Sequence, residues 1–487
     1  MALRGVRQDG ESYIAEAISR GAVAVVGEGE REEESYIRVA DAHGALASLA
    51  ARWYGYPARE LTVIGVTGTN GKTTVTQLIA QLLARCCGAK AGLIGTNEIC
   101  IGGEHFPAER TTPDALTLQR ILRTMADAGC THAVMEVSSH ALVQQRVGEI
   151  PFALGVFTNL TQDHLDYHGS MEAYFAAKEK LFSLCRCAVI NGDDPYGKRL
   201  LTTTNCPVTT FGQKFTNDLV GWKPAYERGA VRFTACSDIE QTETTIAIPG
   251  AFSLYNALAA LAAVTALGIP LCAAAKALPL CHGVRGRAEV VPLPASYTVL
   301  IDYAHTPDGL ENILSTIGAF AEERVILVFG CGGERDKSKR PQMGRIAARN
   351  ADLVILTSDN PRRDDPYGIL HDILSGMAES SAPFAVLENR REAIFYALDH
   401  AKAGDIVLLA GKGHEIYQQI GTEKLPFDER EIIREYFEIN KGSRVSGGGE
   451  TYETDDCILR SEPDGYLSGG ACAPAGAAPT QGGAEHP

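Results

Sequence analysis

A glycine-rich string that ends in a lysine and two threonines is the segment of this sequence best suited to chemistry. From Thr67 to Thr74 it reads Thr-Gly-Thr-Asn-Gly-Lys-Thr-Thr, between an apolar run at 61–66 and a run with helical periodicity. Glycines allow a tight turn whose backbone N–H groups face phosphate oxygens. In such a loop Lys72 reaches the β- and γ-phosphates, and the Thr73 hydroxyl binds Mg²⁺. The string therefore predicts an ATP site formed by Gly68, Thr69, Asn70, Gly71, Lys72, Thr73 and Thr74.

A carboxylate stands where a second part of this site is expected. Glu136 lies in the run 133–137, which has the pattern of a buried strand. A carboxylate at the carboxyl end of a strand beside a phosphate loop suits a Mg²⁺ ligand. Two facts oppose these interpretations. The strict P-loop pattern has glycine where this chain has Val66, and a lone Glu136 is more often a structural hydrogen-bonding group.

The elements that position these residues alternate between strand and helix. Strands are expected at 22–26, 61–66, 133–137, 154–158 and 188–190, with a helix around 13–19 and another from Thr73 to about Arg85. The alternation predicts a mainly parallel sheet with right-handed crossovers. Residues 204–250 are rich in threonine and alternate in polarity, which favours an antiparallel extension. After Arg287 the alternation resumes, with strands at 298–302, 325–329, 353–356 and 406–409, and predicts a second doubly wound unit.

Composition limits the class of protein. The chain has 487 residues, which favours two or three domains. Its net charge of −15 argues against general binding to nucleic acid or an anionic membrane, although local basic clusters still allow an anionic substrate. The 13 cysteines show no zinc-binding spacing, so we expect reduced thiols in a cytoplasmic protein.

Two further segments need interpretation. Residues 257–275 carry no charge until Lys276, but Gly268 and Pro270 interrupt them, so two buried helices are favoured over a membrane span. Residues 441–487 become rich in glycine, alanine and proline, a composition that cannot bury a core, and are expected to be a disordered tail.

The Thr67–Thr74 string resembles the nucleotide loop of the Mur ligase and folylpolyglutamate synthetase superfamily, and the resemblance extends from the N-terminus to about Ile439. It implies an α/β, three-domain Mur ligase architecture, with a central P-loop ATPase-like parallel sheet and a C-terminal Rossmann-like domain. The implied domains are 1–60 for the UDP-linked substrate, 61–287 for ATP and 288–440 for the amino acid. Family members carry a further uridine-contacting segment ahead of Ala2, so we expect domain 1–60 to be truncated.

The resemblance also assigns roles around the nucleotide. His164 is implied to bind a second metal ion, and Lys178 to be carbamylated to N6-carboxylysine as a further ligand. Without the resemblance, Lys178 would be interpreted as an exposed helical lysine. Asn256 is implied to contact the nucleotide, although a helix cap is its plain alternative. Arg287 is implied to meet the phosphates and Asp302 the ribose, while His305 is as consistent with a structural role as with ligand contact.

Two further residue sets are implied to bind the substrates. The UDP-linked substrate is a polyanion, matched by the hydroxyl, amide and guanidinium groups of Thr111, Thr112, Ser138, Gln144 and Arg146. The string Asp359-Asn360-Pro361-Arg362 resembles the signature for meso-diaminopimelate, whose distal carboxylate can pair with Arg362. Asp359 and Glu415 can receive the distal ammonium. The full implied set is Arg335, Asp359, Asn360, Pro361, Arg362, Gly411 and Glu415.

The resemblance implies an ATP-dependent amide-bond ligase that joins meso-diaminopimelate to a UDP-muramoyl-dipeptide during peptidoglycan synthesis. ATP and Mg²⁺ are the expected cofactors, and the partners are small molecules, with no nucleic acid or membrane and a monomeric chain. Two alternatives remain. One is a folylpolyglutamate synthetase, against which the Asp359–Arg362 string argues. The other is a P-loop ATPase or scaffold without synthetase activity.

Overall fold

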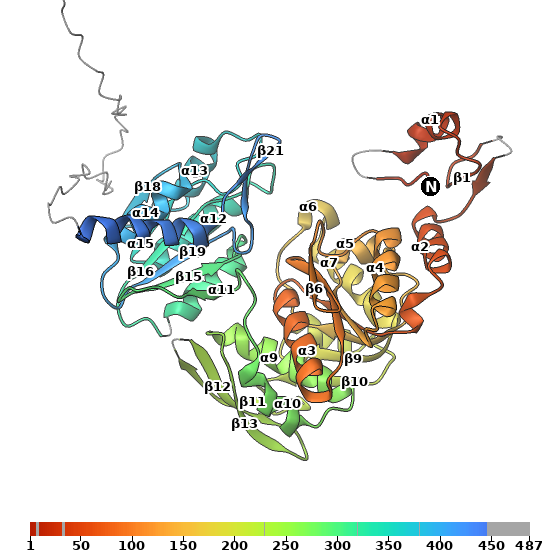
Figure 1. Cartoon of the computed structure of the whole chain (residues 1–487), viewed down its shortest axis with the longest axis horizontal. Coiled ribbons are helices and arrows are strands. Elements are labelled where there is room, and N and C mark those ends of the chain that lie inside the picture. The colour runs from red at the N-terminus through yellow and green to blue at the C-terminus, as the bar shows by residue number, and fades with distance from the viewer. Residues whose placement is uncertain (6–8, 32–34, 228, 319, 379, 446–487) are drawn as a thin grey trace, which may run out of the picture.

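The computed structural model describes residues 1–445 except 6–8, 32–34, 228, 319 and 379. The described residues form three sheet-containing parts in chain order and a separate hairpin (Figure 1). In the first part, the strands β1 (Val25–Gly27) and β2 (Tyr36–Arg38) form one parallel pair. The helices of this part are η1 (Gly10–Tyr13), α1 (Ile14–Ser19), α2 (Ala42–Trp53) and η2 (Pro57–Arg59). Its core is small, with Ala2, Ile14 and Val25 packed on Tyr36.

An eleven-stranded sheet forms the central part. Its spatial order is β13-β12-β11-β10-β9-β8-β3-β7-β4-β5-β6. The strands are β3 (Thr62–Thr67), β4 (Ala91–Ile94), β5 (Glu98–Ile101), β6 (Glu104–Pro107), β7 (His132–Glu136), β8 (Phe152–Phe157), β9 (Cys185–Asn191), β10 (Val208–Gly212), β11 (Leu219–Glu227), β12 (Ala230–Cys236) and β13 (Gln241–Ile246). In this spatial order, the neighbouring strands from β11 through β10, β9, β8, β3 and β7 to β4 all pair parallel. Beyond β11 and beyond β4 the sheet continues with antiparallel strands. The antiparallel extension expected over 204–250 thus begins only after β11, because β10 still pairs parallel to both neighbours.

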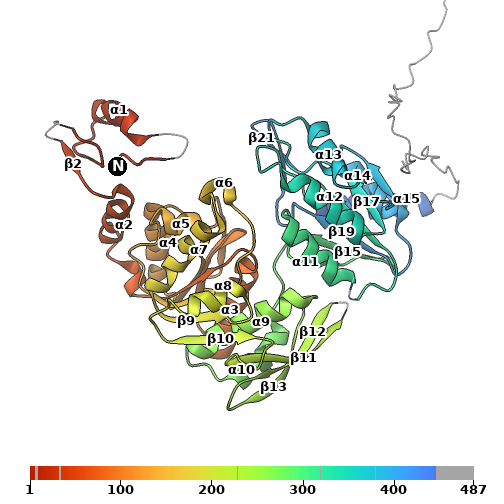
Figure 2. The ribbon, with the colours of Figure 1, turned by 180° about the vertical axis from the view of Figure 1, so that it is seen from behind.

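Helices cover both faces of this sheet (Figures 1 and 2). They are α3 (Lys72–Cys87), α4 (Ala115–Asp127), α5 (Ser139–Val143), α6 (Leu165–His168), α7 (Met171–Glu179), η3 (Lys180–Ser183), α8 (Pro195–Leu201), α9 (Ala251–Ala266), α10 (Leu271–Ala277) and η4 (Leu278–Leu280). Alternate residues of β3 point to opposite faces. Ile64 and Val66 pack with α3 and α9, while Val63 belongs to the core that includes α4 and α7.

The uncharged stretch at 257–275 is two helices joined by a turn, as the sequence predicted. α9 ends at Ala266, Gly268 adopts a left-handed φ of 92°, and Pro270 precedes α10. No helix among the described residues has the length and apolarity needed to span a membrane.

The third part is a six-stranded sheet in the order β14-β15-β19-β16-β17-β18. Its strands are β14 (Glu289–Val291), β15 (Thr298–Asp302), β16 (Val325–Phe329), β17 (Leu353–Leu356), β18 (Phe384–Val386) and β19 (Ile406–Ala410), all parallel except β14. The helices are α11 (Pro307–Gly318), α12 (Lys339–Asn350), α13 (Pro366–Ser375), α14 (Arg390–His400) and α15 (Glu429–Val445), and the hairpin is β20 (Tyr417–Ile420) with β21 (Glu423–Pro426). This is the doubly wound unit expected after Arg287.

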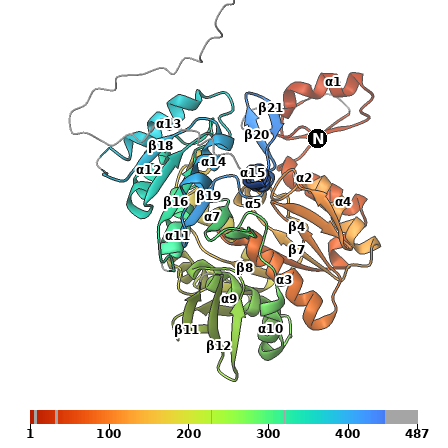
Figure 3. The same ribbon diagram turned by 60° about the vertical axis from the view of Figure 1, so that its left-hand side comes forward.

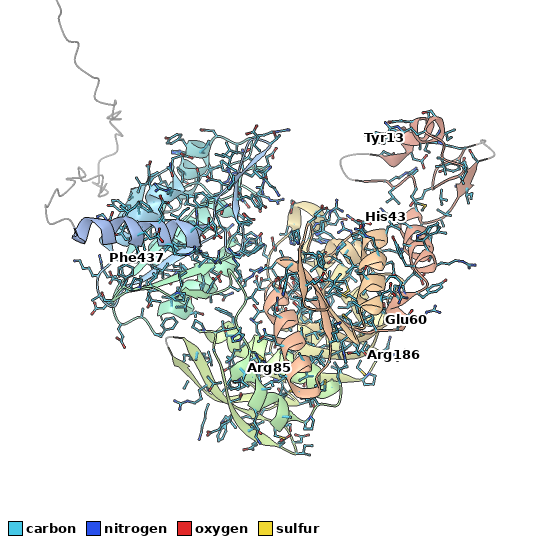
Figure 4. All side chains as sticks on the ribbon, viewed as in Figure 1. Tyr13, His43, Glu60, Arg85, Arg186 and Phe437 are labelled. Carbon is cyan, nitrogen blue, oxygen red and sulfur yellow. The ribbon has the colours of Figure 1, made fainter. Side chains whose placement is uncertain are left out.

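In Figure 1 the hairpin β20–β21 lies at one edge of the C-terminal part, and in Figure 3 α15 is seen end-on below it. Figure 4 places Phe437 of α15 on the C-terminal part and Tyr13 on the N-terminal part. α15 continues to Val445, so the expected start of the tail at 441 lies inside a helix. Residues 446–487, the rest of the predicted tail, lie outside the described residues.

Candidate active site

The phosphate loop is fixed by close contact with the segment that follows β8. Gly68 has a φ of 151°, and a Cβ there would lie 1.9 Å from Thr158 Oγ1, so only glycine fits. Thr69 N donates to Asn159 O at 2.9 Å, and Asn70 N donates to Asn159 Oδ1 at 2.9 Å. Contacts within the protein thus fix the shape of the loop.

The loop leads into a helix N-terminus with the features of an anion site. Gly71 precedes α3 with a φ of 85° and supplies no capping side chain, so the first-turn N–H groups have no intrahelical partners. Lys72 Nζ donates to Gly68 O at 3.0 Å and Thr69 O at 2.9 Å. Burial lowers the pKa of Lys72, and the nearby Glu136 charge opposes that shift. A cation with only carbonyl partners, beside unpaired N–H groups, fits a phosphate chain.

Asn256, on α9, lies against Gly71 of this loop. A Cβ on Gly71 would be 2.4 Å from Asn256 Oδ1. The helix-cap alternative for Asn256 is wrong, because α9 begins at Ala251 after Gly250 and Asn256 is buried in its interior. The proximity to Gly71 agrees with a role at the nucleotide.

Glu136 ends β7 with its carboxylate buried. Its side chain has 0% exposure, and Oε1 accepts a 2.7 Å hydrogen bond from Thr96 N while Oε2 accepts one of 3.1 Å from Thr96 Oγ1. The carboxylate faces Lys72 closely enough to act on its pKa. Thr73, the expected hydroxyl ligand, is also buried, in the first turn of α3. Within the described part of the chain, no group of three or more His, Cys, Asp or Glu has metal-binding geometry. The expected ligand set is of a different composition, since it contains a threonine and a modified lysine.

Lys178 is a buried lysine rather than an exposed helical one. It lies on α7 with 2% exposure, donates to Gly68 O at 2.8 Å and stands 4.6 Å from the centre of the Tyr174 ring. Burial lowers the pKa of Lys178 well below its usual value, and the charge of Lys72 lowers it further. A neutral amine attacks CO₂, so this environment suits a carbamate.

Three histidines gather beside Lys178. The His164 ring lies 5.0 Å from His140 and 6.0 Å from Tyr174, and His140 lies 5.5 Å from His168. Burial lowers the pKa of His164 to about 4, although the Asp163 charge opposes the shift. The imidazole is therefore neutral near pH 7, which is the form that binds a metal. Only His164 was predicted from the sequence, because nothing local marks His140 or His168.

The five residues expected to bind the UDP-linked substrate form one hydrogen-bonded network. Arg146 donates to Thr112 O at 2.8 Å and to Gln144 Oε1 at 2.6 Å. Thr112 Oγ1 accepts from Ser138 N at 3.1 Å. Thr96 Oγ1, whose proton is donated to Glu136 Oε2, lies 3.1 Å from Thr111 Oγ1 and so joins this network to Glu136. The hydrogen bonds thus link the five residues expected to bind the polyanion to Glu136, an expected metal ligand, through Thr96, a residue that no sequence motif marks.

Arg287 and Asp302 flank the junction between the two larger parts. The Arg287 guanidinium lies 4.6 Å from the Tyr303 ring centre, and its buried Nε has no hydrogen-bond partner among the described residues. Asp302 accepts from Ala288 N at 2.6 Å and Ala304 N at 2.8 Å. Burial raises the pKa of Asp302, and Arg287 opposes the shift. His305, for which the sequence left a structural role and ligand contact equally consistent, has its Nδ1 2.8 Å from Tyr303 O.

The residues expected to bind the amino acid meet at the carboxyl ends of β16, β17 and β19. Arg362, with a φ of 52°, donates from NH1 to Gly333 O at 2.7 Å. A Cβ on Gly332 would be 3.0 Å from Arg362 NH1 and 3.7 Å from Arg335 Cγ. The two arginines therefore flank the same glycine turn, and together they form a positive pole.

A negative pole lies beside it. Asp359 is 8% exposed, and its Oδ2 is buried next to Gly411, where a Cβ would be 2.5 Å away. In the part of the chain that the structure describes, this oxygen has no hydrogen-bond partner. Glu415 Oε2 accepts from Asn360 Nδ2 at 2.8 Å and from Lys412 Nζ at 3.3 Å. Burial raises the pKa of Glu415, and the Lys412 charge opposes the shift. Pro361 connects Asn360 to Arg362 and is buried.

A contact between the two larger parts reaches the phosphate loop itself. Asp308, at the start of α11, accepts from Asn70 Nδ2 at 2.6 Å and from Thr161 Oγ1 at 3.1 Å. Asp308 was not predicted from the sequence, since it carries no local motif. This contact joins the nucleotide loop to the sheet that carries the Arg362 and Glu415 groups.

Known families and proteins match most of this sequence. The profile "Mur ligase middle domain" matches residues 66–264, and "Mur ligase, glutamate ligase domain" matches 286–413. The chain is 45% identical, over 89% of its length and 91% of the relative's, to the UDP-N-acetylmuramoyl-L-alanyl-D-glutamate--2,6-diaminopimelate ligase of Caldanaerobacter subterraneus subsp. tengcongensis. It is 48% identical, over 89% of both chains, to the protein of the same name from Gloeobacter violaceus.

A solved structure agrees with these relatives. It is that of a protein named UDP-N-acetylmuramoyl-L-alanyl-D-glutamate--2,6-diaminopimelate ligase, and it aligns with a TM-score of 0.64 at 33% identity, over 88% of this chain and 89% of its own. With two matching domain profiles, close relatives across most of its length and the three-part architecture of its structural neighbour, this chain belongs to the Mur ligase family.

Proposed function

We propose that this protein is an ATP-dependent ligase that adds meso-2,6-diaminopimelate to UDP-N-acetylmuramoyl-L-alanyl-D-glutamate, through an acyl phosphate, in peptidoglycan biosynthesis. The names of its relatives support the substrate pair. The observation that carries the proposal is the paired poles at the carboxyl end of the C-terminal sheet, Arg335 and Arg362 on one side and Asp359 and Glu415 on the other. An amino acid whose far end carries both a carboxylate and an ammonium satisfies both poles at once.

Arg362 is the proposed discriminator between diaminopimelate and lysine. These two amino acids share the distal ammonium, but lysine lacks the distal carboxylate. A guanidinium binds a carboxylate through two parallel hydrogen bonds. With lysine bound, Arg362 would lose that partner, at a cost on the order of 2–4 kcal/mol. The unpartnered Asp359 Oδ2 is available for the ammonium that both amino acids carry.

The phosphate loop and its neighbours fit ATP with Mg²⁺. Thr73, Glu136, His164 and Lys178 as its carbamate are the proposed metal ligands, and the metal would supply charge neutralisation at the transferred phosphoryl group. Lys72 and the first-turn N–H groups of α3 would bind the phosphates. Asn256 and Asp302 would hold the nucleoside, and Arg287, whose Nε is unpartnered, would meet the phosphates from the other side of the junction.

The remaining residues orient the acceptor. Arg146 and the hydroxyls of Thr111, Thr112 and Ser138 would bind the UDP-linked peptide, with Gln144 holding Arg146 in place. A carboxylate and an amine do not condense in water without activation, and the acyl phosphate must be kept from water. The amino-acid poles lie on the C-terminal part and the phosphate loop lies on the central part, and Asp308 connects the two. Binding of both ligands therefore favours an arrangement in which these two parts lie close together.

The proposal also covers the cellular location and the oligomeric state of the protein. ATP and a UDP-linked precursor are cytosolic compounds, which supports a cytoplasmic enzyme. The oligomeric state that we propose is a monomer.

Mass spectrometry of the products tests the assignment. The purified protein is incubated with ATP, Mg²⁺ and the UDP-linked dipeptide, with either diaminopimelate or lysine. We expect the diaminopimelate adduct and little lysine adduct. Arg362→Ala should lower kcat/KM for diaminopimelate by about 30-fold or more while lysine use stays the same. The exposed neighbour offers a matched control, Arg363→Ala, which should keep the preference.

Other products would reject the proposal. Phosphate release that ignores diaminopimelate would indicate an ATPase without synthetase activity. Extension of a folate acceptor with glutamate, and none of the UDP-linked dipeptide, would indicate a folylpolyglutamate synthetase. An unchanged preference in Arg362→Ala would remove Arg362 from the specificity argument.

A further inference from the structure

Lys412 is a fully buried lysine that none of the roles above uses. It follows β19 between two glycines with left-handed backbone, Gly411 with a φ of 111° and Gly413 with a φ of 54°. Its side chain has 0% exposure. A buried ammonium is costly unless it is paired, so this position requires partners that compensate the charge.

Its partners belong to the proposed amino-acid site. Lys412 Nζ donates to Asn360 Oδ1 at 3.1 Å and to Glu415 Oε2 at 3.3 Å. The rings of Tyr417 and Phe427 enclose the ammonium, each with its centre 5.8 Å away. Because Lys412 has no exposed surface, its ammonium acts on a ligand only through the groups that it holds.

The first consequence of this pairing concerns the amide of Asn360. Its Oδ1 receives hydrogen bonds from Lys412 Nζ and from Gln419 N at 2.8 Å, and both of these neighbours are donors. The amide therefore has one orientation, with Nδ2 turned to Glu415 Oε2 at 2.8 Å. Removing Lys412 would remove one of the two donors that fix this orientation.

The second consequence concerns Glu415. Its Oε2 is engaged by Lys412 and Asn360, whereas no described residue donates a hydrogen bond to its Oε1. Burial raises the pKa of Glu415 and the Asp359 charge raises it further, whereas the Lys412 charge opposes both effects. Burial also raises the pKa of the nearby Tyr303 phenol, and the charges of Glu415 and Asp359 raise it further. Lys412 thus favours the ionised carboxylate and leaves one oxygen available.

Among Asp359, Glu415 and Lys412, the charges balance when a ligand cation is present. Asp359 and Glu415 contribute two negative charges and Lys412 one positive charge. A ligand ammonium would neutralise the remainder, at Asp359 Oδ2 and Glu415 Oε1. Without Lys412, two carboxylates would share one buried site, and such a pair retains a proton.

We propose that Lys412 is a positioning residue for amino-acid selection, which holds Asn360 in one orientation and Glu415 in its ionised form so that a distal ammonium can bind. The inference rests on the proposed function for its choice of ligand. The contacts of Lys412 with Asn360 and Glu415 are independent of that choice.

Lys412→Met tests the proposal, because methionine fills a similar volume without charge. The control is Lys424→Met. Lys424 lies on the adjacent hairpin strand, 4.1 Å from the centre of the same Tyr417 ring, but its side chain is exposed. We expect Lys412→Met to raise KM for diaminopimelate by about tenfold or more, with KM for ATP unchanged. The acidic limb of the pH profile of kcat/KM should move to higher pH. Lys412→Arg, which keeps the charge, should restore part of the loss.

A double-mutant cycle separates positioning from packing. In the Glu415→Gln background, Lys412→Met should cost much less than in the unmodified protein, because the carboxylate that it serves is gone. Equal costs in the two backgrounds would overturn the proposal. An unmoved pH profile, or parallel losses for all three substrates, would do the same.

A substrate-free measurement keeps this inference apart from the proposed function. Carboxyl ¹³C NMR of the full chain reports the titration of Glu415, and Lys412→Met should raise the pKa of Glu415 relative to Lys424→Met. If the unmodified protein shows no diaminopimelate-dependent product, the proposed function fails, and the NMR comparison still decides whether Lys412 controls Glu415. If Lys412→Met does not fold, Lys412→Gln takes its place in both measurements.

Discussion

Lys178 illustrates how one side chain can depend on its surroundings for its chemistry. On an exposed helix face it would be a protonated cation. Here its amine is buried beside Tyr174, close to the charge of Lys72, and donates its hydrogen bond to a loop carbonyl. The same burial that makes the ammonium unfavourable makes the neutral amine available to CO₂.

The proposed carbamate on Lys178 leads to a direct prediction. With ¹³C-bicarbonate, the unmodified protein should show a carbamate carbon signal that Lys178→Met lacks. The same substitution should lower ATP-dependent ligation by on the order of 100-fold, because a proposed metal ligand is lost. The exposed Lys180 is the control, and Lys180→Met should retain both signal and activity. Full activity in Lys178→Met would reject the role.

His414 gives a prediction about acid stability. Burial and the charges of Arg287 and Arg430 lower the pKa of His414 from 6.5 to about 4. In that interval the unfolded chain binds a proton that the folded chain does not, so the stability contributed by His414 is complete above pH 6.5 and falls as the pH drops towards 4. His414→Gln should reduce the acid-induced loss in the free energy of unfolding by on the order of 1 kcal/mol. Denaturant titrations at pH 7 and pH 4.5 measure it.

A histidine on a solvent-facing position supplies the comparison for that experiment. His371 on α13 is exposed, so His371→Gln should follow the unmodified protein at both pH values. If His414→Gln and His371→Gln lose the same stability on acidification, the buried state of His414 does not control the effect.

Among the elements, α3 shows how a helix end becomes a binding site. Both of its ends are glycines with left-handed backbone, Gly71 at the start and Gly88 just past the last turn. The end at Gly88 is open, with nothing within 4 Å of an added Cβ, whereas a Cβ at Gly71 would lie 2.4 Å from Asn256 Oδ1.

This asymmetry predicts different outcomes for the same substitution. Gly71→Ala and Gly88→Ala should each cost about 1 kcal/mol of stability from the backbone conformation. Only Gly71→Ala should also lower kcat, by about 100-fold, because it displaces the phosphate loop from Asn256. Thermal unfolding and phosphate release measure the two effects. Equal activity in the two variants would show that the loop tolerates displacement.

The elements also show how far the sequence could predict the structure. Strand β3 and helix α3 were located to within two residues, because an apolar run, a glycine turn and a helical period mark their limits. α9 began earlier than expected, since an alanine-rich segment has no polar boundary and Asn256 resembled a cap. The arginine and carboxylate poles were found through the Asp359–Arg362 string. Lys412 was passed over, because its burial depends on Tyr417 and Phe427 closing over it.

At the scale of the whole molecule, the contact at Asp308 joins parts that are 238 residues apart in sequence. No local pattern predicts such a contact, because it forms only after both sheets have folded. Burial raises the pKa of Asp308, and hydrogen bonds from Thr161 and Asn70 oppose the shift. Because it accepts hydrogen bonds from Asn70 and Thr161, the Asp308 carboxylate connects the phosphate loop to α11.

Asp308→Ala should loosen this connection. We expect KM for ATP to rise by about tenfold, since Asn70 and Thr161 lose a shared acceptor. Hydrogen exchange at residues 67–72 should also become faster. Glu311 lies on the same helix in an exposed ion pair with Arg349, so Glu311→Ala is the control and should change neither quantity. Unchanged exchange in Asp308→Ala would mean that the loop is held by β8 alone.

The division of the proposed site between two sheets has a consequence for how such enzymes diverge. The phosphate loop and the proposed metal ligands belong to the central part, whereas Arg335, Asp359, Asn360, Arg362 and Glu415 lie on loops of the C-terminal sheet. Substitutions on the loops of the C-terminal sheet can therefore change which amino acid is bound without altering the groups proposed to bind phosphate and metal.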